Sequence, residues 1–178
     1  GYQRVGVVAA VGPDVTGWAV GDRVMATRSD WPTPLSAQSG AHAALGNTPA
    51  TELYRVPDTV NDVDAAGTVV AQVGYNAAQR AQIDPGDWAV VYGDGLIGQC
   101  AAQAIQARGA RVILVGHRAE RLALAAQHSA DAVINSHEQD VVEAVRRWTG
   151  VETVTVVLDS VQAESVQREY VPLLARGQ

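Results

Sequence analysis

Three glycines at the spacing Gly93-x-Gly95-x-x-Gly98 form the pattern in this chain with the clearest chemical meaning. They stand between a short apolar run, residues 89–92, and a stretch with apolar residues at helical spacing. In such a strand-to-helix turn the first glycine permits the bend, the second lets the backbone approach a pyrophosphate, and the third lets the helix pack on the sheet. The helix then offers free N–H groups to the phosphates.

The alternative is a glycine-rich turn without a ligand, because a chain with 17 glycines can contain this spacing by chance. The strand–helix–strand context favours a dinucleotide site instead. The predicted site residues in this turn are Gly93, Gly95, Leu96, Ile97 and Gly98.

The second strand of this unit, residues 112–115, runs into Gly116-His117-Arg118. An acid here, about 20 residues past the glycines, would bind the ribose hydroxyls of NAD. Gly116 lacks that carboxylate and leaves room for the 2′-phosphate of NADP, and Arg118 offers a planar, charged fork to it. His117 adds a donor, and Arg121 lies one helical turn further on. The sequence therefore predicts NADP as the cofactor, with NADPH bound more tightly than NADH.

Two further interpretations concern the rim of this site. In the alternative interpretation, Arg118 does not bind a phosphate but pairs with a surface acid such as Glu120. A later strand, residues 153–158, ends at Asp159-Ser160, and ligands bind at the carboxyl edge of open α/β sheets. Val161 is therefore predicted to pack on the cofactor.

The elements that position these residues fall into two regions. Residues 1–60 read as short strands and turns, with strands over residues 4–11 and 52–56 and another that ends at Met25. A helix is predicted over residues 62–81, and from Trp88 strands and helices alternate. Trp148, at helical spacing, is expected in the core. The fold class is α/β, with an open, doubly wound parallel sheet in strand order 3-2-1-4 and domains at 1–60 and 61–178.

Composition limits the protein class. The chain has 178 residues, 47% hydrophobic, and a net charge of -6 without a basic block, so neither nucleic acid nor a membrane is an expected partner. Its apolar runs are too short to span a bilayer and no secretory signal is visible, so a cytoplasmic location is expected. The single cysteine, Cys100, excludes a disulfide framework. The chain opens at Gly1 and closes on a helix end, and we expect it to be a segment of a longer protein.

The sequence resembles the medium-chain dehydrogenase/reductase superfamily, the zinc alcohol dehydrogenase-like proteins. The resemblance rests on residues 5–24 (VGVVAAVGPDVTGWAVGDRV), 85–98 (PGDWAVVYGDGLIG) and 130–135 (ADAVIN). It implies a GroES-like β domain joined to a Rossmann domain, both partial here. It also implies hydride transfer between a nicotinamide cofactor and a small-molecule substrate. We expect the complete protein to be a homo-oligomer.

Departures from the family pattern predict that zinc is absent. Zinc-dependent members have Gly-His-Glu where this chain has Gly1-Tyr2-Gln3, and a tyrosine is not a usual zinc ligand. A further family ligand would fall near Thr68 or Val69, neither of which would serve. The cysteines of the family's structural zinc lobe are missing from residues 27–40. The alternative is a misalignment at the N-terminus.

Tyr2 is the candidate catalytic residue, because it occupies a former ligand position and its hydroxyl can donate a proton to a substrate oxygen. The alternative is a tyrosine that only packs against the cleft wall. His42 is a weaker candidate for substrate contact, and a solitary loop histidine is more often a polar surface residue.

Three functions follow. The first is a zinc-independent NADP(H)-linked oxidoreductase that acts on a carbonyl, an alcohol or an activated double bond. The second is a zinc-dependent alcohol or polyol dehydrogenase with displaced ligands. The third is a non-catalytic nucleotide-binding module.

Overall fold

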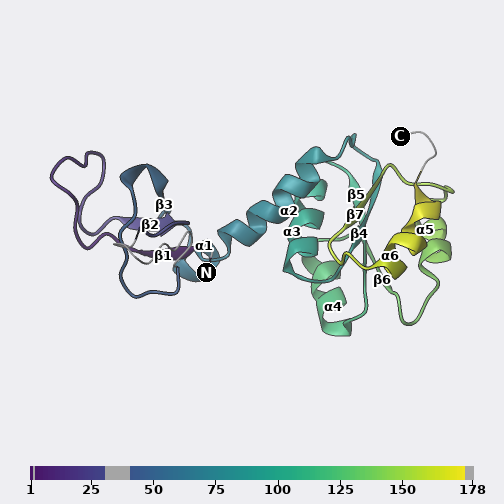
Figure 1. Cartoon of the computed structure of the whole chain (residues 1–178). Coiled ribbons are helices and arrows are strands. Elements are labelled where there is room, and N and C mark those ends of the chain that lie inside the picture. The colour runs from purple at the N-terminus through teal and green to yellow at the C-terminus, as the bar shows by residue number, and fades with distance from the viewer. Residues whose placement is uncertain (2, 31–40, 175–178) are drawn as a thin grey trace. The chain divides into compact units, whose positions relative to one another are not determined.

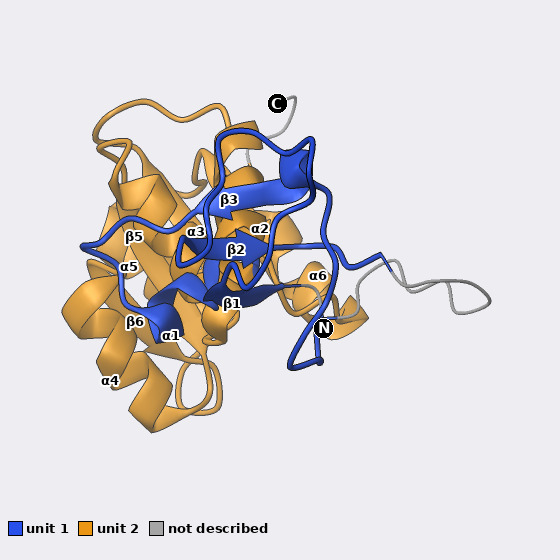
Figure 2. Ribbon diagram, turned by 90° about the vertical axis from the view of Figure 1, so that its left-hand side faces the viewer, with its two compact units in different colours: residues 1–69 blue, residues 70–178 orange. Residues whose placement is uncertain are grey.

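The computed structural model describes residue 1, residues 3–30 and residues 41–174. The chain forms two compact units, Gly1–Val69 and Val70–Gln178 (Figure 2). Their division falls within helix α2 (Thr68–Arg80). The assignment of domains to residues 1–60 and 61–178 stays a prediction.

The first unit is built on a small antiparallel sheet of strands β1 (Arg4–Val7), β2 (Arg23–Ala26) and β3 (Leu53–Arg55), in that order. A 3-10 turn, η1 (Ala50–Glu52), precedes β3. The core of this unit is small and centres on Met25, Val56 and Ala65. The first strand is shorter than the predicted residues 4–11.

The helix predicted over residues 62–81 is two helices, α1 (Asp62–Ala65) and α2. Asn61 caps α1 by accepting a hydrogen bond from the Asp64 N–H at 2.9 Å. The break follows at Gly67, whose N–H donates back to the Asp64 carbonyl at 3.0 Å. Glycine has a low helix propensity, and this tight turn ends α1 before α2 begins.

The second unit is an α/β layer structure around a four-stranded parallel sheet in the order β6-β5-β4-β7. Its strands are β4 (Trp88–Tyr92), β5 (Arg111–Gly116), β6 (Ala132–Asn135) and β7 (Val156–Asp159). Its helices after α2 are α3 (Leu96–Gln106), α4 (Ala119–His128), α5 (Val141–Thr149) and α6 (Glu164–Tyr170), followed by η2 (Val171–Leu173). The predicted doubly wound sheet and its strand order are confirmed.

The core of this unit lies on both faces of the sheet, because successive strand residues point to opposite sides. In β4, Ala89 and Val91 pack with residues of α3 and α4, whereas Val90 and Tyr92 pack with residues of α5 and α6. Figure 1 shows the strands between these two pairs of helices. Burial on both faces explains why the strands are continuously apolar in sequence.

Trp148 is a correction to the predicted core. It lies in the last turn of α5 and is 55% exposed. Val141, Ala144 and Val145 form the buried face of this helix as expected. Among the described residues, no helix is both long and apolar enough to cross a membrane.

Candidate functional site

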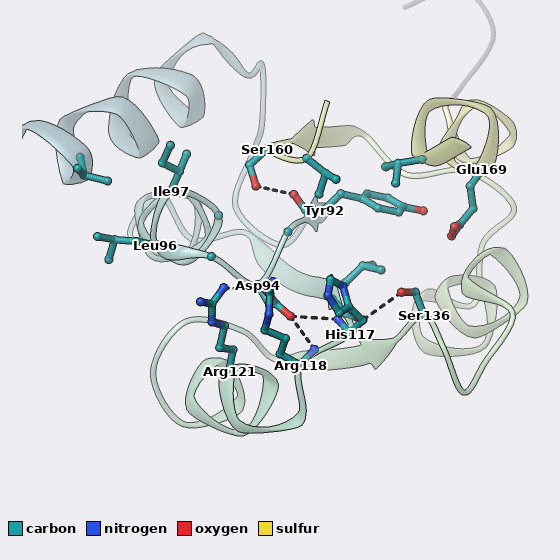
Figure 3. A pocket seen from close by; sticks show the side chains of 18 residues that line it. Tyr92, Asp94, Leu96, Ile97, His117, Arg118, Arg121, Ser136, Ser160 and Glu169 are labelled. Atoms are coloured by element: carbon teal, nitrogen blue, oxygen red, sulfur yellow. Dashed lines mark hydrogen bonds and ion pairs between the residues drawn. The ribbon is translucent and has the colours of Figure 1, made fainter. Parts of the chain in front are cut away.

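A cavity of about 590 Å³ opens at the carboxyl ends of the strands in the second unit (Figure 3). Its wall comes from the turn after β4, the tip of β5, the residues after β6 and β7, and one face of α6. All nine residues that the sequence assigned to the cofactor line it: Gly93, Gly95, Leu96, Ile97, Gly98, Gly116, His117, Arg118 and Val161. The structure brings them together, and their role in binding stays a prediction.

The glycine turn has the geometry that its spacing predicted. Gly93 has φ of +113°, in a region that other residues rarely adopt. A Cβ on Gly98 would lie 2.0 Å from the Gly93 carbonyl oxygen, so only glycine fits there. Gly95 caps α3 without any side-chain hydrogen bond, and a Cβ on it would meet no atom within 4 Å. The first N–H groups of α3 are therefore not satisfied by a cap and are suited to bind an anion.

Asp94, between the first two glycines, is a functional candidate that the sequence-based reasoning missed. It is only 3% exposed, and its Oδ2 accepts hydrogen bonds from the N–H groups of His117 at 3.0 Å and Arg118 at 2.8 Å. Burial opposes its ionisation, but these two hydrogen bonds and the nearby positive charge outweigh burial and lower the pKa of Asp94. The carboxylate therefore ties the glycine turn to the tip of β5.

The space beside Gly116 belongs to Asp94. A Cβ on Gly116 would lie 2.5 Å from the Cβ of Asp94 and 2.7 Å from its Oδ2. The sequence predicted that the absence of a side chain at Gly116 leaves room for the 2′-phosphate of NADP. In the structure, the carboxylate of Asp94 occupies the space next to Gly116. One sequence signal could have revealed the contact between Asp94 and Gly116. It is a charged residue inside the glycine turn together with a glycine, which has no side chain, at the tip of the next strand.

Two arginines surround the same carboxylate. Nη1 of Arg118 lies 3.4 Å and Nη1 of Arg121 3.6 Å from Oδ1 of Asp94. Arg118 thus pairs with Asp94, rather than with the surface acid Glu120. The side chains of Arg118 and Arg121 remain 54% and 49% exposed, and each guanidinium has further N–H donors. The cluster of Asp94, Arg118 and Arg121 therefore carries one net positive charge toward the cavity.

The loop after β7 is fastened to the end of β4. Ser160 donates two hydrogen bonds to the Tyr92 carbonyl, from its N–H at 3.0 Å and its hydroxyl at 2.7 Å. Asp159 accepts from the N–H of Val161 at 2.8 Å. These bonds hold Val161, 48% exposed, at the rim of the cavity.

Position 2, the candidate catalytic Tyr2, lies outside the described residues. Its neighbour Gln3 accepts a hydrogen bond from the N–H of Val69, so two positions that match zinc-binding segments of the family lie together in the first unit. The hydroxyl of Thr68 donates to the Ala65 carbonyl at 2.7 Å. His42 is exposed.

In the part of the chain that the structure describes, no three His, Cys, Asp or Glu side chains gather where they could hold a metal. Zinc independence stays a prediction.

Comparison with known proteins identifies the family. A family model described as "Zinc-binding dehydrogenase" matches residues 97–177. An alcohol dehydrogenase of Geobacillus stearothermophilus is 31% identical over 177 residues, with 88% of this chain and 52% of that protein covered. The 2-haloacrylate reductase of a Burkholderia species is 31% identical over 182 residues, with 99% and 52% covered. The chain belongs to the medium-chain dehydrogenase/reductase superfamily. This confirms the resemblance inferred from the sequence.

The fold of this superfamily member agrees with that assignment. The quinone oxidoreductase of Escherichia coli, solved in complex with NADPH, superposes with a TM-score of 0.79 and 28% identity, and covers 98% of this chain and 52% of that one. The chain spans about half the length of the curated relatives it matches.

Proposed function

We propose that this chain carries the cofactor site of an NADP(H)-dependent oxidoreductase that transfers hydride to or from a carbonyl, an alcohol or an activated double bond without zinc. The observation that carries the proposal is one cavity that combines a glycine turn at a helix N-terminus with two half-exposed arginines at the tip of β5. The first feature suits a pyrophosphate and the second a further phosphate.

The residues of the cavity fit a dinucleotide. The N–H groups at the start of α3 would hold the pyrophosphate, with Gly95 leaving the approach open. The adenosine ribose would lie against Gly116 and His117, and Arg118 and Arg121 would bind its 2′-phosphate. When bound, the nicotinamide supplies the hydride chemistry, and the protein supplies binding and orientation.

Asp94 is the one feature that weighs toward NAD, since a carboxylate near the ribose usually binds its hydroxyls. Here two backbone N–H groups and two guanidinium groups already engage this carboxylate. Most of its acceptor positions are thus engaged within the chain, and the half-exposed arginines favour a phosphate. The complex of the related quinone oxidoreductase with NADPH supports the same cofactor.

The relatives support the reaction class. Their names describe proteins that act on an alcohol, a quinone and a 2-haloacrylate. Each of these three substrates contains a carbonyl, an alcohol or an activated double bond. We propose Tyr2 as the donor that would stabilise the substrate oxygen as the hydride moves.

A zinc-dependent alcohol or polyol dehydrogenase is the second candidate, and the description of the matching family model favours it. A non-catalytic nucleotide-binding module is the third. One set of measurements separates them: calorimetric titration with NADPH and NADH, elemental analysis for zinc, and cofactor turnover with quinone, haloacrylate and alcohol substrates. The proposal expects tighter NADPH binding, turnover and no stoichiometric zinc. Equal affinities contradict NADP preference, bound zinc supports the second candidate, and binding without any turnover supports the third.

A further inference from the structure

Two buried polar atoms of residues that line the cavity have no hydrogen-bond partner within the described residues: the hydroxyl of Tyr92 and Oε1 of Glu169. Tyr92 is the last residue of β4 and is 2% exposed. Glu169 lies near the end of α6, is half-buried as a whole and lines the cavity, while its Oε1 is buried. Polar atoms buried without a partner are rare and costly, and both atoms belong to residues of a cavity wall.

The two side chains approach the same place. Figure 3 shows the Tyr92 ring directed away from the glycine turn and toward Glu169. The ring packs against Tyr170, with centroids 5.5 Å apart, which fixes the direction of its hydroxyl. Burial, followed by the charge of Glu169, raises the pKa of Tyr92, so its hydroxyl remains a donor. Burial and the charge of Asp140 raise the pKa of Glu169.

Other polar groups at this end of the cavity are already engaged. The hydroxyl of Ser136 donates to the Gly116 carbonyl at 3.2 Å, and that of Ser160 donates to the Tyr92 carbonyl. The arginines lie at the other side of the cavity from Glu169, with His117 between them (Figure 3). Tyr92 and Glu169 are therefore the pair left to meet a polar group of a ligand at this end.

The order of groups along a dinucleotide indicates what that group is. If the proposed function holds, the pyrophosphate lies at the glycine turn and the ribose at the tip of β5, so the base attached to that ribose comes next. We infer that Tyr92 and Glu169 recognise the amino-substituted edge of the cofactor's adenine. Glu169 accepts a hydrogen bond from the 6-amino group, and the Tyr92 hydroxyl donates to a neighbouring ring nitrogen. Hypoxanthine has a carbonyl in place of the amino group and reverses this pattern.

The test compares NADPH with its analogue in which hypoxanthine replaces adenine, by calorimetric titration of the chain and of its variants. The wild-type chain is expected to bind NADPH at least about tenfold more tightly than the analogue, the scale of a hydrogen bond to a charged group. Glu169→Gln removes this preference, because an amide also donates to the hypoxanthine carbonyl. Tyr92→Phe weakens NADPH binding severalfold. Its melting temperature without ligand does not fall, because the lost hydroxyl had no partner.

Matched controls lie on the same helix. Tyr170→Phe removes the hydroxyl of the ring that packs against Tyr92 and keeps the ring, and Glu164→Gln neutralises an exposed acid that pairs with Arg168. Both variants are expected to bind as the wild type does. All variants keep the preference for NADPH over NADH, because Arg118 is unchanged.

Three results overturn the inference while the proposed function stands: equal wild-type affinity for the two purine cofactors, unchanged NADPH binding in both site variants, or a lower ligand-free melting temperature of Tyr92→Phe. A wild-type chain that binds no nicotinamide cofactor overturns the proposed function, and the inference with it.

Discussion

The side chain of Asp94 occupies the position that a side chain on Gly116 would need, with only 2.5 Å between the Asp94 Cβ and a Cβ built at residue 116. The acid of this site therefore stands on the glycine turn after β4, and the tip of β5 contributes backbone donors to it. A single carboxylate thus connects the phosphate-binding turn to the segment that carries Arg118.

Gly116→Ala tests this contact. We expect the added methyl group to lower the free energy of unfolding by about 1–3 kcal/mol, the usual cost of overpacking, and to weaken NADPH binding. Denaturant unfolding and titration measure the two effects. Gly6→Ala is the control, because a Cβ there meets no atom within 4 Å. Equal stability of the two variants would show that Asp94 moves aside freely.

Asp94→Asn tests the buried charge. Because the folded-state pKa of Asp94 is lowered, its stabilising contribution is present above the unfolded pKa of about 3.9 and is lost as the pH falls through the folded value. At pH 7 the variant is expected to be about 1–2 kcal/mol less stable, since two half-exposed arginines lose a partner.

The difference between Asp94→Asn and the wild type should shrink as the pH falls below about 4, because the carboxylate takes up a proton there in the unfolded chain and only at lower pH in the folded one. Unfolding curves at pH 7 and pH 3 measure it, with the exposed Asp58→Asn as control. A difference that stays constant across this range would argue against an ionised Asp94 in the folded state.

Arg118→Ala tests cofactor discrimination. The loss of a charged hydrogen bond to the 2′-phosphate is expected to weaken NADPH by roughly 1.5–3 kcal/mol and to leave NADH almost unchanged. Titration of both cofactors decides it, with Arg147→Ala on α5 as the control. Equal losses for NADPH and NADH would show that Arg118 does not recognise the phosphate.

Zinc content is a further test. The described residues hold no metal-binding cluster, and Tyr2 and Gln3 replace a family ligand and its neighbour. We expect less than stoichiometric zinc in the purified protein and the same NADPH affinity after chelation. One tightly held zinc per chain in elemental analysis would contradict this.

The edge strand β7 leads to a prediction about association. Within the described residues it pairs with β4 on one side and is the edge strand on the other, and apolar edge strands invite pairing with a second chain. We expect this chain to self-associate at micromolar concentration in sedimentation velocity. A monomer that unfolds cooperatively would speak against it.

The sequence predicted the sheet and the outline of the site because both depend on local patterns. Apolar runs set the strands, and the glycine spacing together with the strand ends singled out nine residues that line one cavity. Contacts between distant segments were missed. The role of Asp94 depends on residues 116–118, and the only acid considered as an alternative partner for Arg118 was its sequence neighbour Glu120.

The other features that the sequence did not predict also depend on contacts that a local pattern does not contain. Tyr92 and Glu169 reach the same cavity only through the fold, because three strands and their helices separate the two residues in the sequence. The break at Gly67 and the exposure of Trp148 depend on turn geometry and on neighbours that periodicity does not contain. Tyr2 lies outside the described residues, so its predicted role rests on sequence alone.

The contact between Asp94 and Gly116 also constrains how cofactor preference can evolve. An acid at position 116, the usual route to NAD binding, would collide with Asp94 and place two carboxylates together. Loss of Asp94 alone would leave Arg118 and Arg121 without their shared partner. Neither substitution is favourable on its own, so a change of cofactor requires both positions to change together, and the two residues are expected to show strong epistasis.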